Sequence, residues 1–258
     1  MKKSYQVSMF VSPMGHDVNY VSALLKGWLE QTGMYEVAII GECPHASGTI
    51  ENFMKDEERI KATDLFFFLC ADDHWKDETV RRNLEKAVSE GTPILFFHGL
   101  HPCFGDWAEI EKMIGLLWRE EATHGDFNYC DVTMTEVAHP ITEGITGFRT
   151  KDELFCGLTN VWNVEFEVLA TAYSDPELES RWSARGTGNH EPVLTVGNYG
   201  KGRTVDFILG HKWMYYTGHG LLENSIIAFE PPQFKTLLLR SCEWAITGEV
   251  TKGGSCNG

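Results

Sequence analysis

Residues 92–121, TPILFFHGLHPCFGDWAEIEKMIGLLWREE, decide the fold of this chain. Pro93 to Phe97 is a short apolar run, which is typical of a strand buried on both faces. The run ends at His98-Gly99-Leu100-His101-Pro102, because glycine permits sharp backbone angles and proline cannot continue a sheet. Apolar residues then recur at helical spacing, at Trp107, Ile110, Met113, Ile114 and Leu117. This strand–turn–helix corner predicts an open α/β sheet, in which ligands bind beyond the carboxyl ends of the strands.

Strands and helices alternate through the whole first half of the chain. Apolar runs predict strands at residues 5–11, 35–40 and 64–70, and amphipathic patterns predict helices at residues 18–33, 51–61 and 76–90. Alternation at this pace is typical of a mainly parallel sheet with helices on its faces. The predicted fold class is therefore a doubly wound, flavodoxin-like α/β domain.

The second half of the chain has a different character. Strand patterns follow one another at residues 127–137, 148–156, 165–173, 192–197 and 204–209. Residues 139–145 predict a turn that leads into a short helix, the glycines of residues 199–203 predict a hairpin, and residues 232–247 predict a last amphipathic helix. We expect extra antiparallel strands in one domain over residues 1–248, and a disordered tail at 249–258.

Composition excludes several classes of function. The 258 residues carry 37 Asp and Glu against 22 Lys and Arg, a formal charge of −15, which disfavours nucleic acid and anionic membranes as partners. The N-terminus does not read as a signal peptide, and no apolar run approaches the roughly 20 residues that span a bilayer. The seven cysteines form no Cys-x-x-Cys pair. Reduced thiols in a cytoplasmic protein are the expected state.

Several catalytic and cofactor-binding signatures are absent. The segment GNYGKGR lacks the spacing of a phosphate-binding loop, and no Gly-x-Gly-x-x-Gly follows the first strand. His190-Glu191 has no second histidine at the spacing of a zinc protease, and no Gly-x-Ser-x-Gly is present. We therefore expect no nucleotide or flavin cofactor and no serine hydrolase chemistry.

Polar residues gather at the predicted strand ends. They are His16 and Asp17, then Asp72, Asp73 and His74, then His98 and His101, and finally His211. Because the ends of parallel strands share one edge, these histidines and carboxylates are predicted to line one cleft suited to acid/base chemistry or a metal. Structural roles are expected for His45, His124, His190 and His219.

The order of these segments resembles the ThuA-like (trehalose-utilisation) family, whose fold is similar to class I glutamine amidotransferases. The matching segments are ILFFHGLH, GLLWRE, HPITEGITGF, DELF, VLATAYS, PVLTVGNYGKGRTVDFILGH and CEWA. Together they span nearly the whole chain. The resemblance implies cleft residues at His98, His101, Trp118, Arg119, Glu153 and His211, with Asp152 and His139 supporting the turn between them.

The resemblance also implies which chemistry to expect. An amidotransferase cysteine would stand at the corner, where this chain has His98-Gly99, and Cys103 comes several residues too late. The family is tied to catabolism of trehalose and related disaccharides, and is thought to act on their 3-keto forms. An isomerase- or lyase-type enzyme with a small carbohydrate substrate is therefore expected.

Such chemistry needs a base, an acid and a group that stabilises an enediolate. Glu153 or a neutral histidine is the expected base. A divalent metal (Zn, Mn or Fe) on His98, His101 and His211, or the side chain of Arg119, would stabilise the oxyanion. His16, His74, Trp118 and Arg119 are expected to contact the substrate.

Two alternatives stay open at this stage. A non-catalytic sugar-binding or regulatory protein would use aromatic residues only to stack on sugar rings, and the candidates are Trp107, Trp118, Trp213, Tyr215 and Tyr216. A hydrolase would depend on Cys103. The apolar run at residues 213–216 favours a homo-oligomer.

Overall fold

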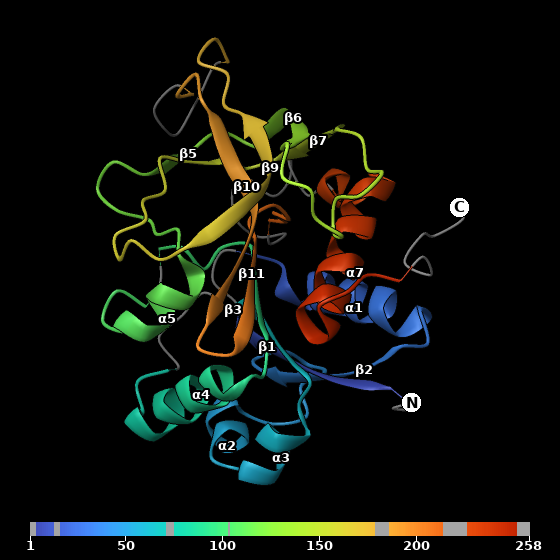
Figure 1. The fold of residues 1–258 in the computed structure, drawn as a ribbon, viewed down its shortest axis with the longest axis vertical. Coiled ribbons are helices and arrows are strands. Elements are labelled where there is room, and N and C mark those ends of the chain that lie inside the picture. The colour runs from blue at the N-terminus through green and yellow to red at the C-terminus, as the bar shows by residue number, and fades with distance from the viewer. Residues whose placement is uncertain are drawn as a thin grey trace.

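Nine strands form a single mixed sheet in the computed structural model, which describes residues 4–12, 16–70, 75–102, 104–178, 186–213 and 226–251. Figure 1 shows the sheet running through the molecule. The strand order is β2-β1-β3-β4-β11-β10-β9-β6-β7. A separate two-stranded sheet pairs β5 (Thr123–His124) with β8 (Phe155–Cys156).

One half of the large sheet is parallel and the other half is antiparallel. The parallel half contains β2 (Tyr35–Gly41), β1 (Tyr5–Ser12), β3 (Leu65–Cys70), β4 (Ile94–Phe97) and β11 (Gly202–Phe207). The antiparallel half continues from β11 through β10 (His190–Tyr199), β9 (Phe166–Tyr173), β6 (Asn128–Met134) and β7 (Phe148–Asp152). The α/β class and the extra antiparallel strands are thus as expected, whereas parallel pairing is limited to the half of the sheet that runs from β2 to β11.

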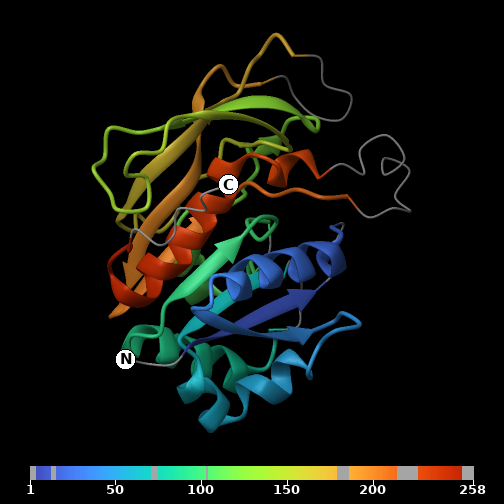
Figure 2. The ribbon, with the colours of Figure 1, turned by 90° about the vertical axis from the view of Figure 1, so that its right-hand side faces the viewer.

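Helices cover both faces of the parallel half (Figure 2). One face packs against α1 (Val18–Gln31) and α7 (Pro232–Thr247), with the short 3-10 helix η1 (Ile227–Phe229) beside them. The other face packs against α2 (Ile50–Met54), α3 (Glu57–Ala62), α4 (Glu78–Glu90) and α5 (Ala108–Ile114). In the part of the chain that the structure describes, no helix has the length and apolarity needed to cross a bilayer.

Alternate residues of each parallel strand feed two separate cores. In β4, Leu95 and Phe97 join the core under α1 and α7, while Ile94 and Phe96 join the core under α2 to α5. All four side chains are fully buried. A strand between two helical layers must be apolar at every position, and the run Pro93–Phe97 meets that requirement.

Two local predictions need correction. The single helix expected at residues 51–61 is two short helices, because Asp56 lies between them and its side chain accepts the Glu58 and Arg59 amides as a new N-cap. Residues 139–145 form turns without a helix, since the amides of Thr142 and Glu143 both close on the His139 carbonyl. The single domain over residues 1–248 stays a prediction, and the tail from residue 252 lies outside the described residues.

The parallel pair β4–β11 ends in two adjacent turns. The register pairs Phe97 with Phe207, and the His98 amide donates to the Phe207 carbonyl at 3.0 Å. Beyond β11 the chain turns at Gly210, whose φ is +126° and whose missing side chain leaves room for the Phe97 ring. The two strand ends therefore deliver His98 and His211 to the same place.

We expect Gly210→Ala to lower the free energy of unfolding by about 2–3 kcal/mol, through backbone strain and overpacking. The added Cβ would lie 2.3 Å from Cζ of Phe97. The matched control is Gly27→Ala in α1, where a Cβ meets nothing within 4 Å. That control should raise stability by up to about 1 kcal/mol because alanine favours a helix. Urea unfolding of both variants checks the prediction, and equal effects would contradict it.

Candidate functional site

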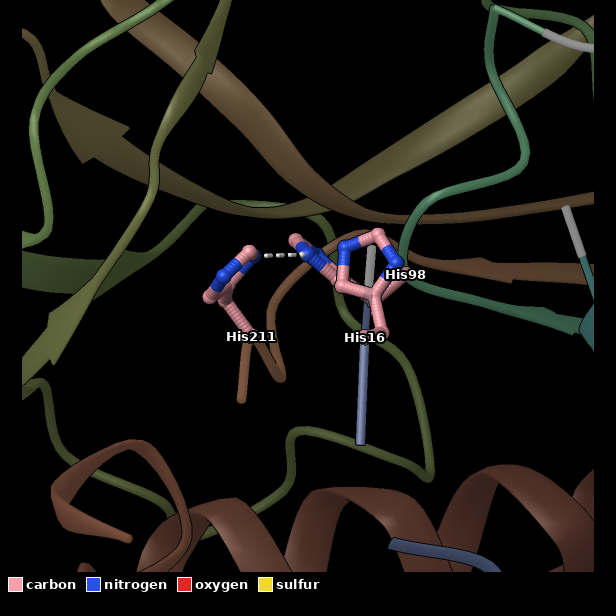
Figure 3. Close-up of side chains that lie close together, drawn as sticks. All are labelled: His16, His98 and His211. Carbon is pink, nitrogen blue, oxygen red and sulfur yellow. Dashed lines mark hydrogen bonds between the residues drawn. The ribbon is translucent and has the colours of Figure 1, made fainter. Parts of the chain in front are cut away.

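Three imidazoles meet beyond the ends of β4 and β11, as Figure 3 shows. They belong to His16, His98 and His211, and one ring nitrogen of each lies within 4.8 Å of the others. The His16 ring is 5.0 Å from that of His98 and 4.7 Å from that of His211, measured between centroids. The shortest link joins Nε2 of His98 to Nδ1 of His211 at 3.0 Å.

His16 reaches this group because its segment pairs with the segment after β11. A β-bridge joins His16 to Trp213, and the Asp17 amide donates to the Lys212 carbonyl at 2.8 Å. The buried Lys212 ammonium also forms an ion pair with Asp17 at 3.0 Å. These contacts hold two segments that are nearly 200 residues apart in the chain side by side at the edge of the sheet.

Hydrogen bonding fixes the proton of His98. Its Nδ1 lies 2.6 Å from the Ile208 carbonyl oxygen, which can only accept, so Nδ1 carries the hydrogen. Nε2 of the neutral ring therefore presents its lone pair toward His211 and His16. An imidazole whose far nitrogen donates to a backbone carbonyl is the usual arrangement of a histidine that binds a metal.

The backbone at the corner is strained. His98 has a backbone φ of +27°, a value that residues other than glycine rarely adopt. Such backbone outliers concentrate at functional sites. Gly99 follows with a φ of +84°, and a Cβ there would lie 2.9 Å from Cε1 of His16. The His98-Gly99 pair thus places one imidazole and leaves room for a second.

Burial keeps the two central imidazoles neutral. It lowers the pKa of His98 well below its usual value, and repulsion from His16 adds to the effect. Burial likewise lowers the pKa of His211, with further contributions from His16 and His98. Nε2 of His211 has no hydrogen-bond partner among the described residues. Both rings are therefore able to offer a lone pair at neutral pH.

A buried carboxylate adjoins the imidazoles. Oε2 of Glu153 lies 3.2 Å from Nδ1 of His211, and Oε1 lies 3.3 Å from Nδ1 of His124. Glu153 is 7% exposed, so it is screened from bulk water. The Glu153 carboxylate, which can accept a proton, is therefore in contact with His211, and His211 is in contact with His98.

Asp152 positions the turn that carries His211. Its carboxylate accepts the amides of Gly210 at 2.7 Å, Glu153 at 2.8 Å and His211 at 3.2 Å. Burial raises the pKa of Asp152 to about 6, although these three bonds oppose that shift. The resemblance implied this supporting position for Asp152. It implied the same for His139, whose ring lies elsewhere, 4.8 Å from that of Trp244 in α7.

His101 does not join the three imidazoles. Its Nε2 lies 2.9 Å from Oδ2 of Asp206, and its ring contacts Phe155 at 5.4 Å between centroids. The Phe155 ring also stacks on the His98 ring, with 5.0 Å between the centroids. The expected metal ligand set of His98, His101 and His211 is therefore replaced in the structure by a group in which His16 stands instead of His101.

Of the residues expected to bind substrate, Trp118 borders the site and Arg119 is paired with another side chain. Trp118 packs its ring against Phe155 at 5.5 Å, at the border of the site. Arg119 donates to Oε1 of the buried Glu111 at 2.7 Å and to the Trp118 carbonyl, so its guanidinium is already paired. His74 and Cys103 lie outside the described residues.

The sequence model of the family described as "ThuA: Trehalose utilisation" matches residues 15–245. The chain belongs to the ThuA family. The match covers every histidine and carboxylate described above, and it agrees with the resemblance of the sequence segments. No match to a curated protein was found.

Solved ThuA-like structures share the fold. A ThuA-like protein from Parabacteroides merdae is 24% identical, with a TM-score of 0.78 over 97% of this chain and 92% of that chain. A second, from Bacteroides uniformis, is 10% identical, with a TM-score of 0.68 over 97% and 96%. A protein from Salmonella typhimurium described as cytoplasmic is 13% identical, with a TM-score of 0.54 over 94% and 100%.

Sequence reasoning missed three residues of this ThuA site. His124 was expected to be structural, yet its Nδ1 faces Glu153. Asp206 gave a readable signal, because a carboxylate within the apolar strand pattern of β11 needs a buried partner. Phe155, whose ring contacts both His98 and His101, gave none, since one aromatic residue in a short strand is ordinary.

A small pocket reaches the imidazole group from the side of α1. Its lining residues are Ser12, His16, Val18, Val21, Leu69, His98 and Gly210. Most of this lining is apolar, so a ligand entering here would lose water before it met the imidazoles. Low polarity around neutral imidazoles strengthens any interaction that they make with a charge.

We predict that stability falls as the pH drops from about 8 to about 6. The buried His98 and His211 have lowered pKa values, so only the unfolded chain takes up protons near pH 6.5. At pH 6 each imidazole then costs about 0.8 kcal/mol of unfolding free energy. Asp152, with its raised pKa of about 6, acts in the opposite sense, because the native chain takes up its proton near pH 6 and so offsets about 0.4 kcal/mol of the loss at that pH.

Urea unfolding in EDTA, repeated at several pH values, checks this prediction. His211→Gln should reduce the loss between pH 8 and pH 6 by more than half, since one of two imidazoles is removed while the opposing effect of Asp152 remains. His45→Gln, at an exposed position, should leave it unchanged. A His211→Gln protein that loses as much stability as the wild type would contradict the assignment.

Proposed function

We propose that this ThuA protein acts on trehalose-related or 3-keto disaccharides by acid/base chemistry through an enediolate, assisted by a divalent metal. The observation that carries the proposal is the connected group of Glu153, His211 and His98 with His16 beside it. A buried carboxylate next to neutral imidazoles is suited to moving a proton to and from carbon.

The proposed reaction needs two proton transfers at carbon, one between the two oxygens, and no external oxidant. Glu153 takes a proton from the carbon next to the sugar carbonyl, and the electron pair of that C–H bond moves to form the enediolate. A proton then returns to the former carbonyl carbon, and the carbonyl forms at the carbon that lost its proton while the hydroxyl hydrogen passes from one oxygen to the other. His124 and His211, on either side of the Glu153 carboxylate, hold it in place and stabilise its charge.

The proposed metal ligands are His16, His98 and His211. Three imidazoles with nitrogens within 4.8 Å fit a site of three protein ligands with an open position. Zinc, manganese or iron would all accept such donors. A bound divalent ion supplies a Lewis acid that polarises a carbonyl and stabilises a developing oxyanion.

The family description supports the substrate class. It names trehalose utilisation, and a chain with a formal charge of −15 is suited to a neutral sugar rather than to a polyanion. Trp118, half-buried at the border of the site, offers a ring face for a sugar. We propose a cytoplasmic location, in keeping with the Salmonella protein of the same fold, and a homo-oligomer stays a prediction.

The finer fold description is part of the same proposal. The order β2-β1-β3-β4 followed by β11, with helices on both faces, supports a doubly wound, flavodoxin-like parallel half. In that arrangement the site lies where ligands of open α/β sheets are expected, beyond the carboxyl ends of β4 and β11.

We predict solvent deuterium uptake at the carbon next to the carbonyl when the metal-loaded protein meets 3-keto-trehalose in D₂O. Glu153→Gln should slow this uptake about 100-fold or more, because the amide cannot accept the proton. Glu143→Gln, at an exposed turn, is the matched control and should keep the wild-type rate. Proton NMR follows the exchange.

Two results would contradict the proposed chemistry. No uptake by the wild type with zinc, manganese or iron would reject the enediolate, and uptake unchanged in Glu153→Gln would reject the base. If calorimetry then showed sugar binding without turnover, the non-catalytic sugar-binding alternative would take its place.

A further inference from the structure

A second buried pair of histidine and carboxylate lies beside the imidazole group. His101 follows β4 and Asp206 belongs to β11, and their side chains are 0% and 2% exposed. Nε2 of His101 lies 2.9 Å from Oδ2 of Asp206. Charged or polar side chains this deeply buried usually have every polar atom paired.

This pair has two unpaired atoms. Nδ1 of His101 and Oδ1 of Asp206 are buried without a hydrogen-bond partner among the described residues. Leaving a buried polar atom unpaired costs about 1–3 kcal/mol, so a purely structural pair would be expected to avoid it. Unpaired atoms of this kind often mark a place where another group binds.

The Asp206 carboxylate decides which nitrogen of His101 carries the hydrogen. An ionised carboxylate can only accept, so Nε2 of His101 is the donor. In the neutral ring Nδ1 is then a lone-pair base, and in the charged ring it is an acid. In both states the unpaired atom is the one that exchanges a proton.

Phe155 connects this pair to the imidazole group. Its ring stacks on His98 at an interplanar angle of 29° and meets His101 edge-on at 84°. The backbone makes a second link, because the Trp118 amide donates to the His101 carbonyl at 3.0 Å. His101 thus shares one aromatic neighbour with His98 and is hydrogen-bonded to the tryptophan at the border of the site.

We propose that His101 is the second proton-transfer group of this site, and that Asp206 is the positioning residue that fixes its hydrogen on Nε2. The inference rests on the proposed function, since an enediolate needs one group to remove a proton and another to return it. Glu153 removes the proton from one carbon, and Nδ1 of His101 delivers a proton to the next. Protonated Glu153 then releases its proton to water and deprotonated His101 takes one up from water, so the cycle balances.

The tautomer of His101 tests the positioning role without any substrate. In protein labelled with ¹⁵N-histidine, long-range ¹H–¹⁵N NMR distinguishes a ring protonated at Nε2 from one protonated at Nδ1, and His101→Gln identifies the signal. We expect hydrogen on Nε2 in the wild type, in the neutral ring alone and in the charged ring together with Nδ1, and a mixture of neutral tautomers in Asp206→Leu, which removes the acceptor. A neutral wild-type ring with its hydrogen on Nδ1 would overturn the proposal.

Kinetics test the proton transfer itself. Asp206→Asn and His101→Gln should lower kcat for isomerisation, followed as deuterium that appears on the former carbonyl carbon, about 10–100-fold, with KM changed less than threefold. Thr204→Val, two residues earlier in β11 and also buried, is the control for packing and should keep kcat. Normal rates in both His101→Gln and Asp206→Asn would overturn this inference and leave the proposed function standing. A wild type without uptake would overturn both.

Discussion

The parallel pairing of β4 with β11 is the constraint on which the site depends. It joins residues that are about 110 positions apart in the chain and ends with the hydrogen bond from the His98 amide to the Phe207 carbonyl. Because both strands run in the same direction, both turns emerge at one edge of the sheet. His98 then donates from Nδ1 to the Ile208 carbonyl, so the backbone of one turn orients the imidazole of the other. The carboxylate of Asp152 holds the turn after β11 in place by accepting the amides of Gly210 and His211.

Desolvation gives the site its chemistry. Charging a ring that has been removed from water is unfavourable, so the pKa values of His98 and His211 fall well below their usual value. A neutral imidazole can bind a metal or accept a proton, whereas a charged imidazole can do neither. The same burial would make an isolated carboxylate unfavourable, and Glu153 has two histidines within 3.3 Å. The histidines and the carboxylate therefore depend on one another.

Local patterns in the sequence predicted what is local in the structure. Residues 232–247 form the expected last helix, and the apolar run before His98 is a strand between two helical layers. The sequence also pointed to His98 and His211, because each stands just after a strand end, and the family resemblance pointed to Glu153. It could not separate His101 from this group, since the partner of His101 is Asp206, about 105 residues away in the chain. His124 was missed because its place depends on β5 pairing with β8, a contact between residues about 30 apart.

The most direct test of this account is the metal content of the purified protein, measured by plasma mass spectrometry after loading with zinc, manganese or iron and desalting. The account predicts nearly one divalent ion per chain in the wild type. It predicts loss of that ion in His16→Ala and in His98→Ala, and retention in His101→Gln, whose ring is paired with Asp206. A wild type that retains no metal, or a metal lost in His101→Gln and kept in His16→Ala, would contradict it.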